Sequence, residues 1–165
     1  LWSELQVRRF LFDDQPVSMD VARATLNICL SRRETGTGLW VLRLADNGAP
    51  VGCAGLNPAA ASTSHEPRLA GLLEPLAALH PEHWHRGYAI EALDALLRHA
   101  FETLGQERVG AANDLPNLAS ARMLERLGFV PIGKVQGPRY RMRTYILTRE
   151  AWRRRMRRGA SPDEG

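Results

Sequence analysis

The sequence predicts an α/β (α+β) domain in which a mixed, mostly antiparallel sheet is flanked by helices. First, the turn Asp46-Asn47-Gly48 lies between two apolar runs, which is typical of an antiparallel hairpin. Second, strand and helix patterns alternate after residue 69, which favours β–α–β units with parallel pairing in the same sheet. Third, a length of 165 residues suits one domain with a substantial core.

The first half of the chain is expected to supply one helix and the hairpin. The expected elements are a helix from a Ser18 or Asp20 cap to about Arg33, strands from Leu39 to Ala45 and from Val51 to Leu56, and a loop over residues 57–68. The helix is indicated by residues three and four positions apart, namely Val21, Ala24, Thr25, Ile28 and Cys29. Residues 1–16 are expected to be irregular because Asp13-Asp14 and Pro16 break regular structure.

The second half is expected to supply the centre of the sheet. The expected elements are a strand from Leu69 to Leu79, a helix from about Ala89 to Leu104, a strand from Arg108 to Ala112, a helix from Asn117 to Gly128, strands from Phe129 to Lys134 and from Arg141 to Thr148, a basic helix over 149–158 and a disordered tail over 159–165. Pro75 either shortens the first of these strands or requires a bulge in it, because proline cannot donate to a ladder.

Composition excludes several classes of protein. No apolar run approaches the roughly 18 residues that a membrane span needs, so no membrane partner is expected. The chain opens with no signal-peptide pattern, although it starts at Leu1 and not at Met. Cys29 and Cys53 fit no ligand spacing and are expected as reduced thiols of a cytoplasmic protein.

The net charge of +4 is concentrated at the C-terminal end. Residues 149–158 hold six arginines and one glutamate, whereas the rest of the chain is close to neutral. Such a run can contact nucleic acid or ribosomes, but it contains no aromatic residue except Trp152. A solvated helix end is therefore the favoured interpretation.

The segment from Pro81 to Leu93 carries the most specific chemical signal. It is expected to form a strand end, a tight turn with basic residues and glycine, and then an amphipathic helix. Such a turn directs main-chain N–H groups and a helix N-terminus at one point, where an anion such as a pyrophosphate can bind. Gly87 lets the backbone approach a phosphate, and Arg86 adds a positive charge.

This segment resembles motif A of the GNAT superfamily of N-acetyltransferases, with Trp84, Gly87 and Ala89 at the motif positions. Further downstream, Asn117-x-x-Ser120 and Leu127-Gly128-Phe129 resemble motif B. Trp84 at the start and Glu91-Ala92 at the end are similar to the branch that includes ribosomal-protein-alanine acetyltransferases. The resemblance covers about residues 70–152.

The resemblance implies that residues 1–165 form a single acetyltransferase domain whose sheet is splayed between its two central parallel strands. Acetyl-CoA would bind as co-substrate in that splay. The residues implied in binding it are Leu79, His85, Arg86, Gly87, Tyr88, Ala89, Asn117 and Ser120. His85 departs from the pattern, because this branch usually has glycine there. Asn117 is also expected to cap its helix.

Acetyl transfer needs a base, since an amine is protonated at pH 7. Glu74 on the strand before motif A is the first candidate, and His80 and His83 are alternatives. Glu74 could instead hold an arginine or a backbone amide. A main-chain N–H near Leu76 or Ala77 would polarise the acetyl carbonyl.

The group that protonates the leaving thiolate is less well defined. Many relatives place a tyrosine at the position of Leu124, which this chain lacks. Ser120 is the candidate acid, with Tyr140 or water as alternatives, and Ser120 could equally be a surface serine of its helix.

The resulting hypothesis is an acetyl-CoA-dependent N-acetyltransferase. It would act on a primary amine, either a protein N-terminus or a small molecule, by direct attack on the thioester. The alternative is a non-catalytic acyl-CoA-binding regulatory module of the same fold. A homodimer is a further expectation from relatives. The histidines His80, His83 and His85 lack firm partners, so no metal site is predicted.

Overall fold

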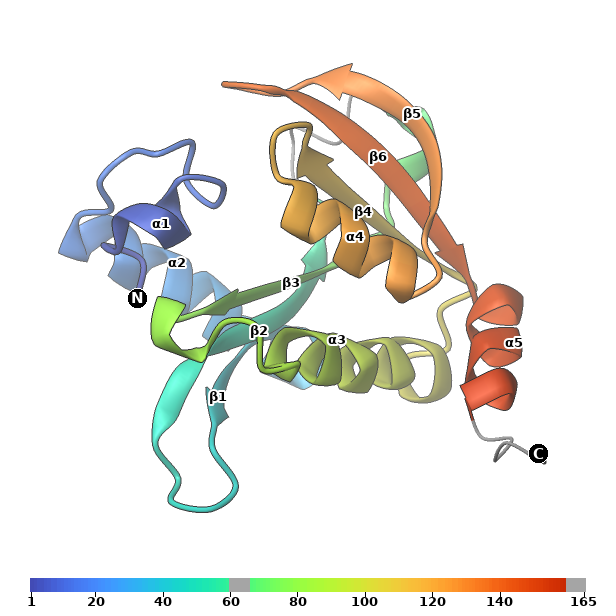
Figure 1. The fold of residues 1–165 in the computed structure, drawn as a ribbon, viewed down its shortest axis with the longest axis horizontal. Coiled ribbons are helices and arrows are strands. Elements are labelled where there is room, and N and C mark those ends of the chain that lie inside the picture. The colour runs from blue at the N-terminus through green and yellow to red at the C-terminus, as the bar shows by residue number, and fades with distance from the viewer. Residues whose placement is uncertain (60–65, 160–165) are drawn as a thin grey trace.

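A computed structural model describes residues 1–59 and 66–159 of the chain. Its centre is a six-stranded sheet in the order β1-β2-β3-β4-β6-β5 (Figure 1). The strands are β1 (Gly38–Arg43), β2 (Pro50–Pro58), β3 (Leu73–Leu79), β4 (Arg108–Asp114), β5 (Val130–Gln136) and β6 (Arg141–Thr148). Neighbouring strands pair antiparallel except β3 and β4, which are parallel. This confirms the predicted mixed, mostly antiparallel sheet.

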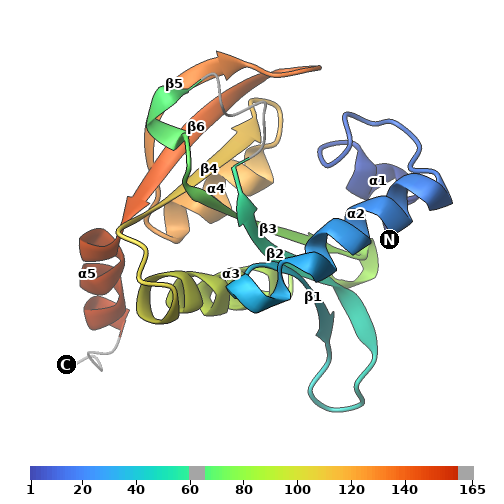
Figure 2. The same ribbon diagram turned by 180° about the vertical axis from the view of Figure 1, so that it is seen from behind.

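Helices cover both faces of this sheet. They are α1 (Leu5–Arg8), α2 (Met19–Ser31), α3 (Tyr88–Arg98), α4 (Leu118–Arg126) and α5 (Arg149–Gly159). The view from behind shows α1 and α2 on the face opposite α3 and α4 (Figure 2). The predicted caps are confirmed at Ser18, which accepts from the Val21 N–H, and at Asn117, which accepts from the Ser120 N–H.

Two separate apolar clusters identify the two faces. The larger cluster lies under α3 and α4 and includes Leu97, Phe101 and Tyr145, each at most 2% exposed. The smaller cluster, formed by Val7, Cys53 and Ala78, lies under the N-terminal segment. Because side chains alternate along a strand, these clusters show which face each strand residue points to.

Several element boundaries differ from those predicted. Residues 5–8 form the short helix α1 in a segment expected to be irregular. The central strand begins at Leu73 and not at Leu69, because residues 67–69 form a 3₁₀ turn and Gly71 has φ +75°. The helix expected to reach Leu104 ends at Arg98 and continues as a π-helical turn. Residues 60–65 of the predicted loop and 160–165 of the predicted tail lie outside the described residues.

Helix α2 is rotated relative to the predicted apolar stripe. Val21 and Ile28 are more than half exposed, whereas Thr25 and Cys29 face the sheet side. The helix packs against β1, the outermost strand, so only a narrow stripe of small residues is needed there. Cys29 and Cys53 are free thiols, as predicted.

Helix α5 is held to the domain by Trp152, which is 4% exposed and lies 5.2 Å from the Phe101 ring. Several of its arginines have acidic partners: Arg149 with Glu107, Arg154 with Glu150 and Arg155 with Asp94. These ion pairs neutralise part of the basic run, and its interpretation as a solvated helix end stays a prediction. None of the helices in the described part of the chain has the length and apolarity to cross a membrane.

Candidate active site

The site is organised by a divergence of the two central parallel strands. Strands β3 and β4 are in register only at Leu73 and Val109, and they separate toward Leu79 and Asp114 (Figure 1). The His80 N–H donates to the Val51 carbonyl of β2, so the main chain of alternate residues in β3 faces β4 instead. Pro75 is one of those residues and has no N–H to donate to β4. It sits in the strand opposite Leu56 without a bulge.

The same alternation assigns main-chain groups to the splay. The N–H groups of Ala77 and Leu79 point away from β2 and into the splay between β3 and β4. The Leu79 carbonyl also faces this side, where it accepts the indole N–H of Trp84 at 2.8 Å. Trp84 therefore ties the following turn to the end of β3.

The turn after β3 leaves its main-chain donors available. His85 has φ +61° and Gly87 φ +84°, so two left-handed residues flank Arg86. The Glu91 N–H is the first to bond back, to the Gly87 carbonyl. Within the described structure, the N–H groups of residues 85–90 donate to no other group. Six consecutive donors at a helix N-terminus form an anion-binding surface.

The predicted glycine has a definite geometric role. A Cβ added to Gly87 would meet no atom within 4 Å, so the space in front of this residue is open. Its positive φ excludes most other residues from this position. Arg86 is exposed and forms no ion pair with any described residue, so its charge can act on an anion at the turn.

Helix α4 lies at the β4 side of the splay. Asn117 caps it through Oδ1, which accepts the Ser120 N–H at 3.1 Å, so the capping role holds. The Ser120 hydroxyl has no hydrogen-bond partner among the described residues. Leu124 is 4% exposed and belongs to the large core cluster, so this position contributes packing and no hydroxyl group.

Glu74 bridges the two central strands. Its Oε1 accepts the Ala112 N–H of β4 at 2.9 Å, so this side chain holds a backbone amide. Leu73 and Ala77 pack on the α3 and α4 side and Ala78 on the other, so Glu74 points to the N-terminal face. The carboxylate thus lies at the narrow end of the splay, and its role as a base stays a prediction.

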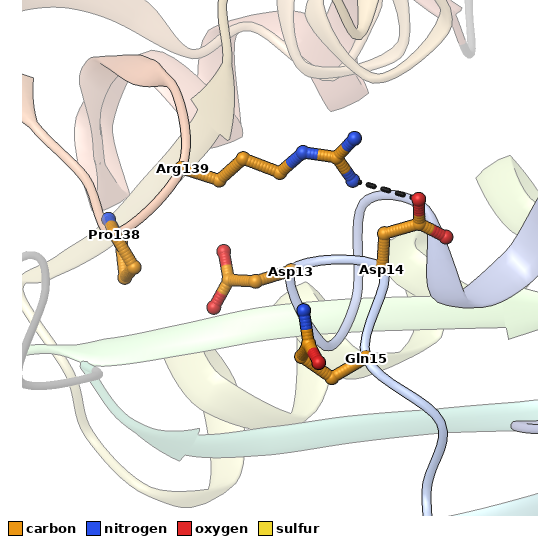
Figure 3. Close-up of a pocket in the computed structure, with 5 residues that line it drawn as sticks. All are labelled: Asp13, Asp14, Gln15, Pro138 and Arg139. Atoms are coloured by element: carbon orange, nitrogen blue, oxygen red, sulfur yellow. Dashed lines mark ion pairs between the residues drawn. The ribbon is translucent and has the colours of Figure 1, made fainter.

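Sequence reasoning missed a group of charged residues on that N-terminal face. An open pocket of about 430 Å³ is lined by Asp13, Asp14, Gln15, Pro138 and Arg139 (Figure 3). The doublet Asp13-Asp14 was interpreted only as a breaker of regular structure. Its chemical signal depends on Arg139, which is more than 120 residues away in the chain and adjacent only after folding.

Asp114 ends β4 beside this pocket. It is 9% exposed, and no described residue hydrogen-bonds to its side chain or forms an ion pair with it. Burial raises the pKa of the Asp114 carboxyl above its ordinary value, the charge of Asp13 raises it further, and Arg139 partly opposes both. Asp114 was predicted neither as a strand residue nor as a site residue.

The histidines near the turn form no metal centre in the described part of the chain. His80 lies 3.6 Å from a carboxylate oxygen of Glu82, and the His80 and His83 rings are 6.4 Å apart. These contacts do not direct three ligands at one point.

A family model described as an acetyltransferase (GNAT) domain matches residues 1–130, well over half of the chain. The chain belongs to the GNAT acetyltransferase family. Acetyl-CoA as the co-substrate of this chain belongs to the function proposed below. The family and the fold predicted from the sequence are thereby confirmed. The finer assignment to the ribosomal-protein-alanine branch stays a prediction.

The GNAT fold is shared with solved structures from several bacteria. A protein from Bordetella pertussis assigned to the GnaT acetyltransferase family is 28% identical, with a TM-score of 0.71 over 78% of this chain and 77% of that chain. A GNAT-family acetyltransferase from Bacillus anthracis is 17% identical, with a TM-score of 0.70 over 90% of this chain and 84% of that chain. The yncA protein of Salmonella typhimurium, solved with its cofactor acetyl-CoA, is 21% identical, with a TM-score of 0.64 over 94% and 84%.

Among curated proteins, the GNAT chain is similar to YoaA of Bacillus subtilis (strain 168), which is described as an uncharacterized N-acetyltransferase. The two are 41% identical over 49 residues, which is 30% of this chain and 28% of YoaA. The matched segment therefore spans less than a third of this curated relative.

Proposed function

We propose that this enzyme transfers the acetyl group of acetyl-CoA to a primary amine by direct attack of the amine on the thioester. The observation that carries the proposal is the series of main-chain N–H groups over residues 85–90 that have no acceptor among the described residues. They lie beside the splay of β3 and β4. A diphosphate at this turn would accept several main-chain hydrogen bonds and would also be stabilised by the helix dipole of α3.

The rest of the cofactor would extend from the turn into the splay. Arg86 would add charge to the diphosphate, and the N–H groups of Ala77 and Leu79 would bond the pantetheine arm or the acetyl carbonyl. Asn117 and Ser120 would approach the same arm from α4. These roles combine main-chain groups of β3 with side chains of the facing helix.

The proposed acetyl transfer uses protein groups on both sides of the thioester to move protons and stabilise charge. The ammonium group would first lose one proton to solvent water. The free amine nitrogen would then form a bond to the carbonyl carbon and pass its second proton to Glu74, directly or through water. The Ala77 N–H stabilises the charge that develops on the carbonyl oxygen. The carbon–sulfur bond then breaks, and the leaving thiolate takes a proton from water or from the Ser120 hydroxyl, which regains it from water. The proton held by Glu74 passes to solvent, so that the carboxylate is restored for the next turnover.

Glu74 suits the role of a base because its orientation is fixed. One carboxylate oxygen accepts the Ala112 N–H at the narrow end of the splay. A carboxylate held in one orientation by a backbone donor loses less rotamer freedom when it accepts a proton from the substrate.

The proposal is tested by measuring acetyl-CoA binding and release of free CoA thiol with a panel of primary amines. We expect cofactor to raise the Tm and thiol to appear only when an amine is present. Absence of any Tm shift at millimolar acetyl-CoA would overturn the proposal. Binding without turnover for every amine would support the non-catalytic module instead, which the buried Leu124 favours because it supplies no acid.

A further inference from the structure

A pocket lies between the N-terminal loop and the β5–β6 hairpin, on the face of the sheet where the acceptor amine would approach Glu74. Asp13, Asp14 and Gln15 form one wall, and Pro138 and Arg139 form the other (Figure 3). Its volume of about 430 Å³ falls in the range of small-molecule sites. The pocket and the Glu74 side chain both lie on the face of the sheet opposite α3 and α4.

The charges around this pocket do not balance. The Asp14 carboxylate lies 2.9 Å from the Arg139 guanidinium and 3.8 Å from that of Arg8, so both cations are directed at the same carboxylate. Asp13 and Asp114 have no ion-pair or hydrogen-bond partner among the described residues. Three carboxylates face two guanidinium groups, which leaves an excess negative charge.

Asp114 supplies independent evidence for a ligand. The residue is 9% exposed, no described residue forms a hydrogen bond or ion pair with its side chain, and the charges that act on its carboxyl group come from Asp13 and Arg139, which both line the pocket. Ala111 packs in the core under α3 and α4, so by strand alternation Asp114 points to the opposite face, as Glu74 does. A buried carboxylate without a partner is costly unless a cation binds beside it.

We infer that this pocket binds a second positive charge of the acceptor, so that the preferred substrates are diamines or longer polyamines. The inference rests on the proposed function and adds to it the class of amine. One amino group would reach Glu74 and the thioester, while the distal ammonium group would lie between Asp13 and Asp114. A monoamine or an amino acid of equal length would lose this ion pair or place a carboxylate against it.

Three acceptors of matched length test this inference. They are 1,4-diaminobutane, butylamine and 4-aminobutanoate, each assayed by thiol release at saturating acetyl-CoA. We expect kcat/KM for the diamine to exceed that for butylamine about tenfold, chiefly through KM, and 4-aminobutanoate to be the poorest. Equal values for the diamine and butylamine, or preference for 4-aminobutanoate, would overturn the inference.

Substitutions in the pocket test whether it causes the preference for the diamine over butylamine. Asp13→Asn and Asp114→Asn should each reduce the ratio of kcat/KM for the diamine to kcat/KM for butylamine. Asp46→Asn, in the exposed hairpin turn, is the matched control and should leave the ratio unchanged. A ratio that survives both pocket variants contradicts the inference even if the enzyme is active.

A binding measurement separates the two proposals. Calorimetry of 1,4-diaminobutane with the intact protein needs no turnover, and we expect binding that weakens in Asp114→Asn. If acetyl-CoA fails to bind, the proposed function is wrong, whereas binding of the diamine still supports the charged pocket. If acetyl-CoA binds and the diamine does not, the function stands and the inference is wrong.

Discussion

The two sides of the β3–β4 splay are built in different ways. The proposed cofactor turn is a continuous segment, residues 84–90, whose donors are main-chain N–H groups. The proposed acceptor pocket is lined by side chains from two distant segments, around Asp13 and Arg139, and Asp114 of β4 is a third segment whose carboxyl group is influenced by both. Main-chain groups can be positioned by a short motif, whereas the charged pocket exists only after three parts of the chain have met. The proposed site for the acetyl donor is therefore encoded by one short stretch of sequence, whereas the proposed site for the acceptor is not.

Glu74 lies at the junction of the two sides, so its replacement is expected to have the largest effect. In Glu74→Gln the amide oxygen still accepts the Ala112 N–H, but the side chain takes no proton. We expect kcat to fall about 100-fold while the Tm and acetyl-CoA affinity stay nearly unchanged. Steady-state kinetics and calorimetry measure these quantities, with Glu102→Gln as an exposed control. A kcat within threefold of wild type would show that another group removes the proton.

Gly87→Ala tests the main-chain side of the comparison. Gly87 and Gly48 have φ +84° and +71°, and a Cβ at either would meet no atom within 4 Å. Alanine should therefore cost both positions a similar strain of about 1 kcal/mol. Only Gly87→Ala should also weaken acetyl-CoA binding, by about tenfold, because its methyl group occupies the space of the diphosphate. Equal affinities in Gly87→Ala and Gly48→Ala would place the cofactor elsewhere.

His85→Gly distinguishes a strained residue from a phosphate ligand. Glycine adopts φ +61° without the side-chain penalty, although it gains more freedom in the unfolded chain. We expect a small net rise in Tm and an acetyl-CoA affinity at least equal to that of the wild type. Weaker binding with unchanged Tm would mean that the imidazole contacts the cofactor.

Asp114→Asn is expected to stabilise the protein while impairing the pocket. The folded-state pKa of Asp114 is raised, so the wild type is penalised once pH exceeds that value, and the penalty disappears below the unfolded-state pKa near ~3.9. At pH 7 the variant should melt about 2–4 °C higher, roughly 1 kcal/mol for a domain of this size. The difference should shrink as pH falls through the acidic range. Thermal denaturation between pH 3.5 and 8 measures it, and a lower Tm at pH 7 would contradict the expected penalty.

Sequence patterns predicted the fold well where packing follows local periodicity. The hairpin, the helix capped by Asn117 and the last strand, Arg141–Thr148, all occur as expected. The patterns were wrong where tertiary contacts decide, as at α2, whose position at the sheet margin leaves Val21 and Ile28 exposed. Likewise, periodicity could not show that the helix after the turn changes to a π-helical turn beyond Arg98.

The candidate site divides in the same way. Gly87 and Asn117 could be identified from sequence because turn and cap chemistry depend on near neighbours. The contact of Glu74 with Ala112 joins residues 38 positions apart and needed the sheet register. Asp114 could not be recognised at all, because its significance lies in burial and in the absence of a partner.

The bond from the Trp84 indole to the Leu79 carbonyl places a fluorophore at the end of β3, at the start of the turn proposed to bind the diphosphate. Trp84 is 37% exposed, so its emission will respond when a bound molecule displaces water from that corner. Intrinsic fluorescence can consequently follow occupancy of the turn in real time, without any label or coupled reaction. Replacing Trp84 with phenylalanine would remove both the optical signal and the tie between strand and turn.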